Sequence, residues 1–185
     1  MPSRLYFRKT QSQPLAGLRI AVKDIFHLKG VKTSCCSRGY LDVYPEQTST
    51  ASSIQSLIDK GAQIVGKTHL SSFAMREEPT ECVDFQAPFN PRADGYQSPA
   101  GSSSGSGAAI ASYDWLDVTI GTDSMLEARV LTRPLTSCSH RKRETTSSME
   151  RSLRNASLRR SVFFAGYGRN MPAIRFSFVV HERHR

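Results

Sequence analysis

The stretch Ser98-Pro-Ala-Gly-Ser-Ser-Ser-Gly-Ser-Gly-Ala-Ala-Ile-Ala111, which continues to Gly121-Thr-Asp-Ser124, decides the fold of this 185-residue chain. Three glycines free its backbone to adopt positive φ and to approach other groups closely, while four serines place hydroxyls along the same turn. These residues are Gly101, Gly105, Gly107, Ser102, Ser103, Ser104 and Ser106. A loop of this composition either cradles an anion or presents a hydroxyl for chemistry.

The residues that follow the loop predict a helix and then a strand. Residues 108–112 are small or apolar and open the helix, whose first N–H groups would face the loop. Leu116, Val118 and Ile120 then alternate with other residues in the period of a strand, which Gly121 ends.

Upstream of the loop, the sequence predicts a strand, a helix and a second strand. Residues 18–22 form a short apolar run with β-branched members, which is typical of a buried strand. Apolar residues recur at i, i+3 and i+4 within residues 51–60, so we expect an amphipathic helix with a Ser/Thr cap at its start and Gly61 at its end. Residues 63–65 provide the second strand. This order predicts a parallel βαβ unit and an α/β fold.

Four motifs in this order resemble the amidase signature family of serine hydrolases. They occupy residues 14–24, 61–68, 89–91, and 101–109 followed by 121–123. The resemblance implies a partial amidase signature fold, with a mixed or parallel sheet and flanking helices. It also implies hydrolysis of the carbon–nitrogen bond of a small-molecule amide, with no metal and no cofactor.

The resemblance also assigns roles to residues of this chain. Lys23 is similar to the family's base, and Ser103 resembles the relay serine, held in a cis peptide, because it stands at the family's spacing before Gly121-Thr122-Asp123. Ser102 and Ser104 are neighbours with a weaker claim. The relay passes a proton to a lysine that must first be neutral, a state that burial favours.

The nucleophile of the family has no counterpart in this chain. The family's pattern places Gly-Gly-Ser shortly after the Gly-Thr-Asp motif, and N–H groups after Asp123 and Ser124 would form the oxyanion hole. Here Met125 and Leu126 replace the two glycines and Glu127 stands at the position of the serine. The sequence therefore predicts that this chain does not hydrolyse amides.

The charge distribution divides the chain. Residues 1–124 hold 12 basic and 12 acidic residues, whereas residues 125–185 hold 13 and 4 and so account for the whole net charge of +9. We therefore predict an N-terminal segment at 1–13, a partial amidase domain at 14–124 and a basic Arg/Ser-rich tail at 125–185. The tail is expected to be disordered or to reflect a changed reading frame or a retained intron, because the family's motifs stop abruptly at Ser124.

The remaining polar residues predict no further site. Cys35, Cys36, Cys82 and Cys138 lack metal-ligand spacing, and as part of a strand the adjacent pair would point to opposite faces and serve packing. His69, without a partner in the sequence, is expected to be structural. Reduced thiols and the lack of a long apolar run favour a cytoplasmic protein that does not meet a membrane.

Two other functions stay open. One is the amidotransferase branch of the same family, which acts on charged tRNA as part of a complex. The other is a non-enzymatic protein whose basic tail binds nucleic acid non-specifically; otherwise no nucleic-acid partner is expected. A P-loop and a dinucleotide fold are disfavoured, because the Gly/Ser loop lacks a Gly-Lys-Ser/Thr ending and no spaced glycines directly follow Lys23.

Overall fold

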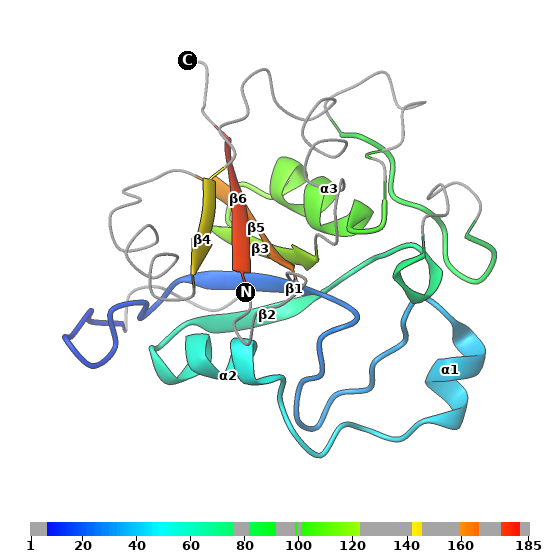
Figure 1. The fold of residues 1–185 in the computed structure, drawn as a ribbon, viewed down its shortest axis with the longest axis horizontal. Coiled ribbons are helices and arrows are strands. Elements are labelled where there is room, and N and C mark those ends of the chain that lie inside the picture. The colour runs from blue at the N-terminus through cyan, green and yellow to red at the C-terminus, as the bar shows by residue number, and fades with distance from the viewer. Residues whose placement is uncertain are drawn as a thin grey trace.

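The structure is a computed structural model that describes residues 7–75, 82–91, 99 and 101–122, and residues 142–145, 160–166 and 175–181 as strands. Its strands form one sheet in the order β2-β1-β3-β5-β6-β4 (Figure 1). The strands β1 (Arg19–Lys23), β2 (Gln63–Thr68) and β3 (Val118–Thr122) pair in parallel, with β1 between the other two. The predicted α/β class and the parallel βαβ unit are confirmed.

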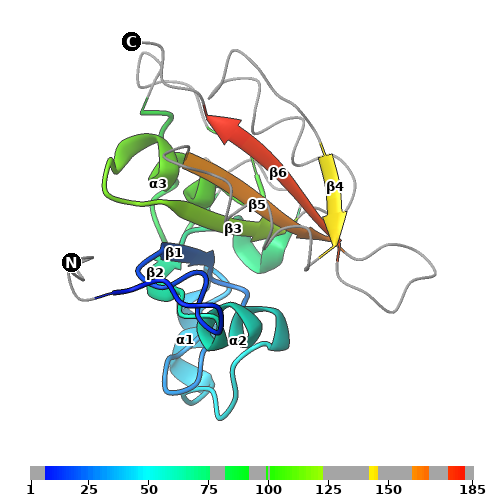
Figure 2. The same ribbon diagram turned by 90° about the vertical axis from the view of Figure 1, so that its left-hand side faces the viewer.

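Two helices cover opposite faces of these strands (Figures 1 and 2). On one face, α2 (Ser52–Asp59) packs Ile54 and Leu57 against Ile20 and Val22 of β1. On the other face, Ile110 of α3 (Ser104–Ser112) joins Ala21 and Leu116 in a smaller cluster. Because side chains alternate along a strand, the side chain of Lys23 falls on the same face as that of Ala21, toward α3.

The end of α2 agrees with the sequence prediction, but its start does not. Gly61 has φ +92° and donates its N–H to the carbonyl of Ile58, and Ala62 donates to Leu57, which is the Schellman arrangement that favours glycine. At the start, the cap is Ala51, which makes no side-chain capping bond, so the expected Ser/Thr cap is wrong. The carbonyl of Ala51 instead accepts the N–H of Gln55.

Two features between β1 and α3 differ from the sequence expectations. Helix α1 (Arg38–Val43), capped by Ser37, lies in a segment that showed no period, and it has no buried residue. Cys35 and Cys36 form a turn with φ of 49° and 58° rather than part of a strand. A short 3₁₀ segment, η1 (Ser72–Ala74), follows β2.

Within the basic tail, the structure describes three segments, and each is a strand. They are β4 (Lys142–Thr145), β5 (Arg160–Gly166) and β6 (Arg175–His181). β5 pairs in parallel with β3, while β6 pairs antiparallel with both β5 and β4. The sequences of β5 and β6 contain Val and Phe, which favour strands where disorder was expected. The three-part division of the chain stays a prediction.

No helix among the described residues is both long enough and apolar enough to span a membrane.

Candidate active site

Three side chains with polar atoms stand at or just beyond the carboxyl ends of neighbouring parallel strands. Lys23 ends β1, Thr122 ends β3, and His69 directly follows β2. Lys23 pairs with Thr68 across the β1–β2 ladder, so these strand ends are level. In open α/β sheets the carboxyl edge of the strands is where ligands bind, and here the Gly/Ser loop lies over that edge.

Lys23 is fully buried, with an exposed fraction of 0%. Its Nζ donates to Ser102 Oγ at 2.6 Å and to Thr122 Oγ1 at 2.6 Å. A buried amine loses the solvation of water, so hydroxyl partners of this kind are what makes its burial possible. Lys23 is a predicted site residue, whereas Thr122 is known from the sequence only as part of the Gly-Thr-Asp motif, with no role assigned to its side chain.

Among the serines of the loop, the structure brings Ser102 to the lysine. Ser102 is 2% exposed, and the peptide bond that joins it to Gly101 is cis. Ser103, which the family spacing favoured, donates its hydroxyl to the carbonyl of Thr122 at 3.2 Å and accepts the Thr122 N–H at 3.1 Å. The relay role of Ser103 stays a prediction, while Ser102, one residue earlier, is hydrogen-bonded to Lys23.

Ser104 begins α3 and turns away from the lysine. Its Oγ lies 3.2 Å from Nδ1 of His69. The next residue, Gly105, donates its N–H to the carbonyl of His69 at 3.1 Å, and a Cβ on Gly105 would lie 2.4 Å from the His69 nitrogen. Only glycine allows this approach, which anchors the first turn of α3 on the residue after β2.

Ser106 fixes α3 to two strands. Its Oγ lies 2.9 Å from Thr68 Oγ1 and donates to the carbonyl of Ile120 at 3.3 Å, and Thr119 donates its hydroxyl to the Ser106 carbonyl at 3.1 Å. Buried hydroxyls are stable only when they are hydrogen-bonded, so this network holds the loop in one position relative to Lys23.

The other predicted site residues, Asp123 and Ser124, lie outside the described residues, as does Glu127. The described part of the predicted site is therefore Lys23 with the loop serines Ser102, Ser103 and Ser104, and of these serines Ser102 is hydrogen-bonded to the lysine.

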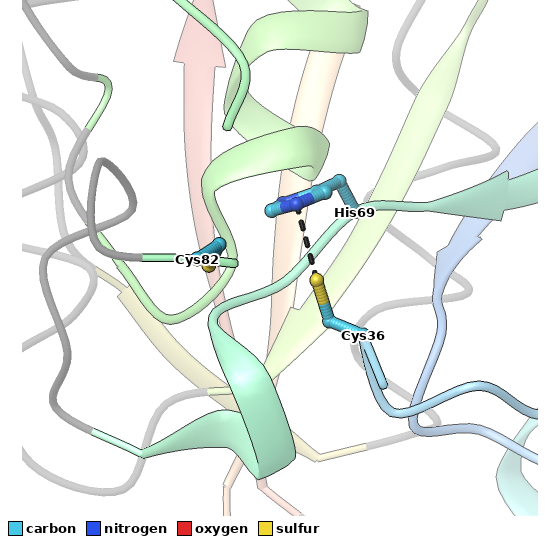
Figure 3. A group of neighbouring side chains, drawn as sticks. All are labelled: Cys36, His69 and Cys82. Atoms are coloured by element: carbon cyan, nitrogen blue, oxygen red, sulfur yellow. Dashed lines mark hydrogen bonds between the residues drawn. The ribbon is translucent and has the colours of Figure 1, made fainter. Parts of the chain in front are cut away.

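A second cluster lies beside the Gly/Ser loop and consists of Cys36, His69 and Cys82 (Figure 3). The Sγ of Cys36 is 3.1 Å from His69 Nε2, and Cys82 completes the group. Burial lowers the pKa of His69, against the opposing effects of a backbone contact at Phe85 and of the Asp24 charge. Burial, followed by the neighbouring Cys82, raises the pKa of Cys36 to about 12. Sequence reasoning missed this cluster, because its members are far apart in the chain.

A central parallel sheet and a buried lysine hydrogen-bonded to a serine from a Gly/Ser loop define the class of protein as an amidase-like α/β protein. The Amidase family model matches residues 3–124, and the chain belongs to this family.

Relatives and solved structures agree with this assignment. The chain is 41% identical over 115 residues to the A-type subunit of glutamyl-tRNA(Gln) amidotransferase from Natronomonas pharaonis, covering 62% of this chain and 26% of the relative. It is 43% identical over 110 residues to the protein of that name from Trichormus variabilis, covering 60% and 22%. The chain thus spans about a quarter of the length of these relatives.

Two solved structures share the fold. The A-type subunit of the Thermotoga maritima amidotransferase matches with a TM-score of 0.57 and 29% identity, over 76% of this chain and 30% of that one. The peptide amidase of Stenotrophomonas maltophilia matches with a TM-score of 0.56 and 28% identity, over 72% and 27%.

Proposed function

We propose that this chain carries the proton-transfer part of an amide-hydrolysing site, with Lys23 as the base and Ser102 as the relay. The observation that supports the proposal is the hydrogen bond of 2.6 Å between Lys23 Nζ and Ser102 Oγ, both buried. Proton transfer needs a donor and an acceptor within hydrogen-bond reach, and this pair meets that demand before a substrate binds. The role assigned to Ser103 from spacing therefore passes to Ser102.

In this mechanism the neutral amine of Lys23 takes the hydroxyl proton of Ser102, which in turn takes the proton of an attacking serine. The attacking oxygen forms a bond to the amide carbon, the carbon–nitrogen bond breaks and the proton returns along the same path to the leaving nitrogen; water then hydrolyses the ester that remains on the serine. Thr122 Oγ1 is a second hydrogen-bond partner of the lysine at 2.6 Å and so would help to hold the amine beside Ser102.

The chain has no serine at the position of the attacking group, where Glu127 stands instead. A carboxylate at that position would repel the negative charge that develops on the carbonyl oxygen. Met125 and Leu126 also replace the glycines of the turn. We propose that the chain retains the proton relay of an amidase without completing amide hydrolysis.

The relay assignment can be tested by NMR on protein with ¹⁵N-labelled lysine. We expect the Nζ resonance of Lys23 to move in Ser102→Ala, because that variant removes a hydrogen-bond partner at 2.6 Å. Ser104→Ala is the matched control, since its hydroxyl faces His69, and it should leave the resonance in place. If the Nζ resonance of Lys23 is unchanged in Ser102→Ala but moves in Ser103→Ala, the proposal fails and Ser103 is the relay, as the family spacing predicted.

A second candidate is a role as part of a tRNA-dependent amidotransferase. It is supported by the identity of 41% and 40% to two proteins named as the A-type subunit of glutamyl-tRNA(Gln) amidotransferase. Co-purification of the chain with a second subunit would favour this function over that of a free amidase with a small-molecule substrate. A cytoplasmic location belongs to either proposal, and the free thiols of Cys35, Cys36 and Cys82 support it.

A further inference from the structure

Three side chains with metal-binding atoms meet beside the Gly/Ser loop, outside the proposed proton relay. Cys36 precedes α1, His69 follows β2, and Cys82 comes from a separate loop (Figure 3). Their ligand atoms all lie within 4.8 Å of one another, and the Cys36 Sγ is 3.1 Å from His69 Nε2. Nothing in the proposed amide chemistry uses these three groups.

We propose that Cys36, His69 and Cys82 form a binding site for a zinc ion. Two thiolates and one imidazole are a donor set that Zn²⁺ prefers, and three protein ligands leave a fourth tetrahedral position open. The soft sulfur ligands disfavour Mg²⁺ and Ca²⁺, which take oxygen ligands.

The positions of the three atoms are close to those that the ion needs. Around a tetrahedral zinc with bonds of about 2.0–2.3 Å, neighbouring ligand atoms stand about 3.5–3.8 Å apart. The observed contact of 3.1 Å between sulfur and nitrogen is slightly shorter, and the other separations are at most 4.8 Å. Side-chain rotations that move the ligand atoms by about 1 Å or less would therefore bring all three to bonding distance from one zinc ion.

The histidine is held in the orientation that a ligand requires. Its Nδ1 lies 3.2 Å from Ser104 Oγ, so a proton on Nδ1 can be donated to that hydroxyl, leaving the lone pair of Nε2 to face the cysteines. Metal-ligating histidines ordinarily make such a bond with their second nitrogen, which fixes the tautomer and the ring. Ser104 is a positioning residue at this site.

The donor set has to change its protonation state when the ion binds. Zn²⁺ stabilises the thiolate form of a cysteine, so each thiol would release its proton as its sulfur bonds to the metal.

The backbone holds Cys36 in place through an unusual turn. Cys35 and Cys36 both have positive φ, and the Cys35 carbonyl accepts the N–H of Phe73, itself at φ 54°, at 2.9 Å. Positive φ is costly for residues other than glycine and persists where the surrounding structure enforces it. The turn thus fixes the position from which the Cys36 side chain reaches His69.

The test uses the full chain, reduced and then incubated with zinc chloride before free metal is removed. Metal content per chain is measured by mass spectrometry, and the coordinating atoms are identified by X-ray absorption on the wild-type protein. Three variants each remove one ligand: Cys36→Ser, Cys82→Ser and His69→Gln. The matched control is Cys35→Ser, which changes a cysteine adjacent to a ligand that is not itself a ligand. The absorption measurement needs no variant, so it decides the question even where a variant fails to fold.

We expect one zinc per chain with two sulfur ligands and one nitrogen ligand from the protein. Ser104→Ala removes a group that orients a ligand, and such changes typically weaken metal binding roughly 10- to 100-fold, so we expect a loss of that size. Each variant that removes a ligand should weaken zinc binding by more than this. Cys35→Ser should bind as the wild type does. The proposal is overturned if the reduced chain retains no zinc, if Cys36→Ser and Cys82→Ser retain it equally well, or if other atoms coordinate it. A Cys36–Cys82 disulfide with no zinc uptake after reduction would likewise overturn it and would make the pair a redox site.

Discussion

At the scale of single residues, the position of one serine relative to one lysine decides which hydroxyl could serve the proposed proton relay. The sequence predicts the roles of Lys23 and of the Gly/Ser loop. The loop contains three consecutive serines, however, and their distances along the chain from the Gly-Thr-Asp motif differ by only one residue each. The path of the backbone decides among them, because it turns Ser102 to Lys23, Ser103 to the backbone of Thr122 and Ser104 to His69. A count along the chain carries no information about these directions.

Gly105 provides a prediction at this scale. Alanine in place of a helical glycine usually adds about 1 kcal/mol of stability. Here the new Cβ would lie 2.4 Å from the backbone nitrogen of His69, which cannot rotate away as a side chain does. We therefore expect Gly105→Ala to lower the free energy of unfolding by about 1–3 kcal/mol, measured by urea denaturation.

Gly66→Ala is the control for this experiment, because a Cβ at Gly66 meets nothing within 4 Å. It should change stability by no more than about 1 kcal/mol in either direction. Equal stabilities of the two variants would show that the contact between α3 and His69 is looser than the structure has it.

At the scale of elements, the sequence was most informative where burial imposes a period. The helix at 52–59 buries one apolar face, and the strands at 19–23 and 118–122 are buried on both faces; the helical period and the short apolar stretches predicted them. Helix α1 escaped prediction because none of its residues is buried and Gly39 lies within it. The turn at Cys35 and Cys36 could not be predicted, since positive φ at two cysteines follows from contacts with the distant residues Ser72 and Phe73.

The packing of α3 on the sheet depends on Ser106, which gives a prediction at this scale. Removing its hydroxyl in Ser106→Ala leaves Thr68 Oγ1 without its 2.9 Å partner in a buried position. An unsatisfied buried hydroxyl costs about 1–3 kcal/mol, so we expect a loss of that size in thermal or urea unfolding.

Ser112→Ala, at the exposed end of the same helix, is the matched control and should lie within about 0.5 kcal/mol of the wild type. The role given to Ser106 fails if its variant is as stable as Ser112→Ala.

At the scale of the whole molecule, an amidase-family sheet is joined to a stretch that lacks the family's motif. The family match ends at residue 124, and the chain then continues with Met125, Leu126 and Glu127 where the pattern requires Gly-Gly-Ser. The strands β4, β5 and β6 extend the sheet beyond that point. The origin of this stretch in a changed reading frame or a retained intron stays a prediction.

The loss of three consecutive motif residues limits what a single mutation can repair. Glu127→Ser would supply a hydroxyl, yet Met125 and Leu126 would still stand where the turn requires the freedom of two glycines. In the proposed mechanism both losses would act on the same step, since the family's turn is expected to present the nucleophile and the oxyanion donors together.

The most direct test of the central claim is an assay of the full chain with a simple aryl amide, beside a complete amidase of the family as positive control. We predict no turnover above background for the wild type or for Glu127→Ser, in protein shown by circular dichroism to be folded. Turnover of the wild type that is abolished by both Lys23→Ala and Ser102→Ala would contradict this claim, because the proton relay would then be serving a nucleophile other than the missing serine.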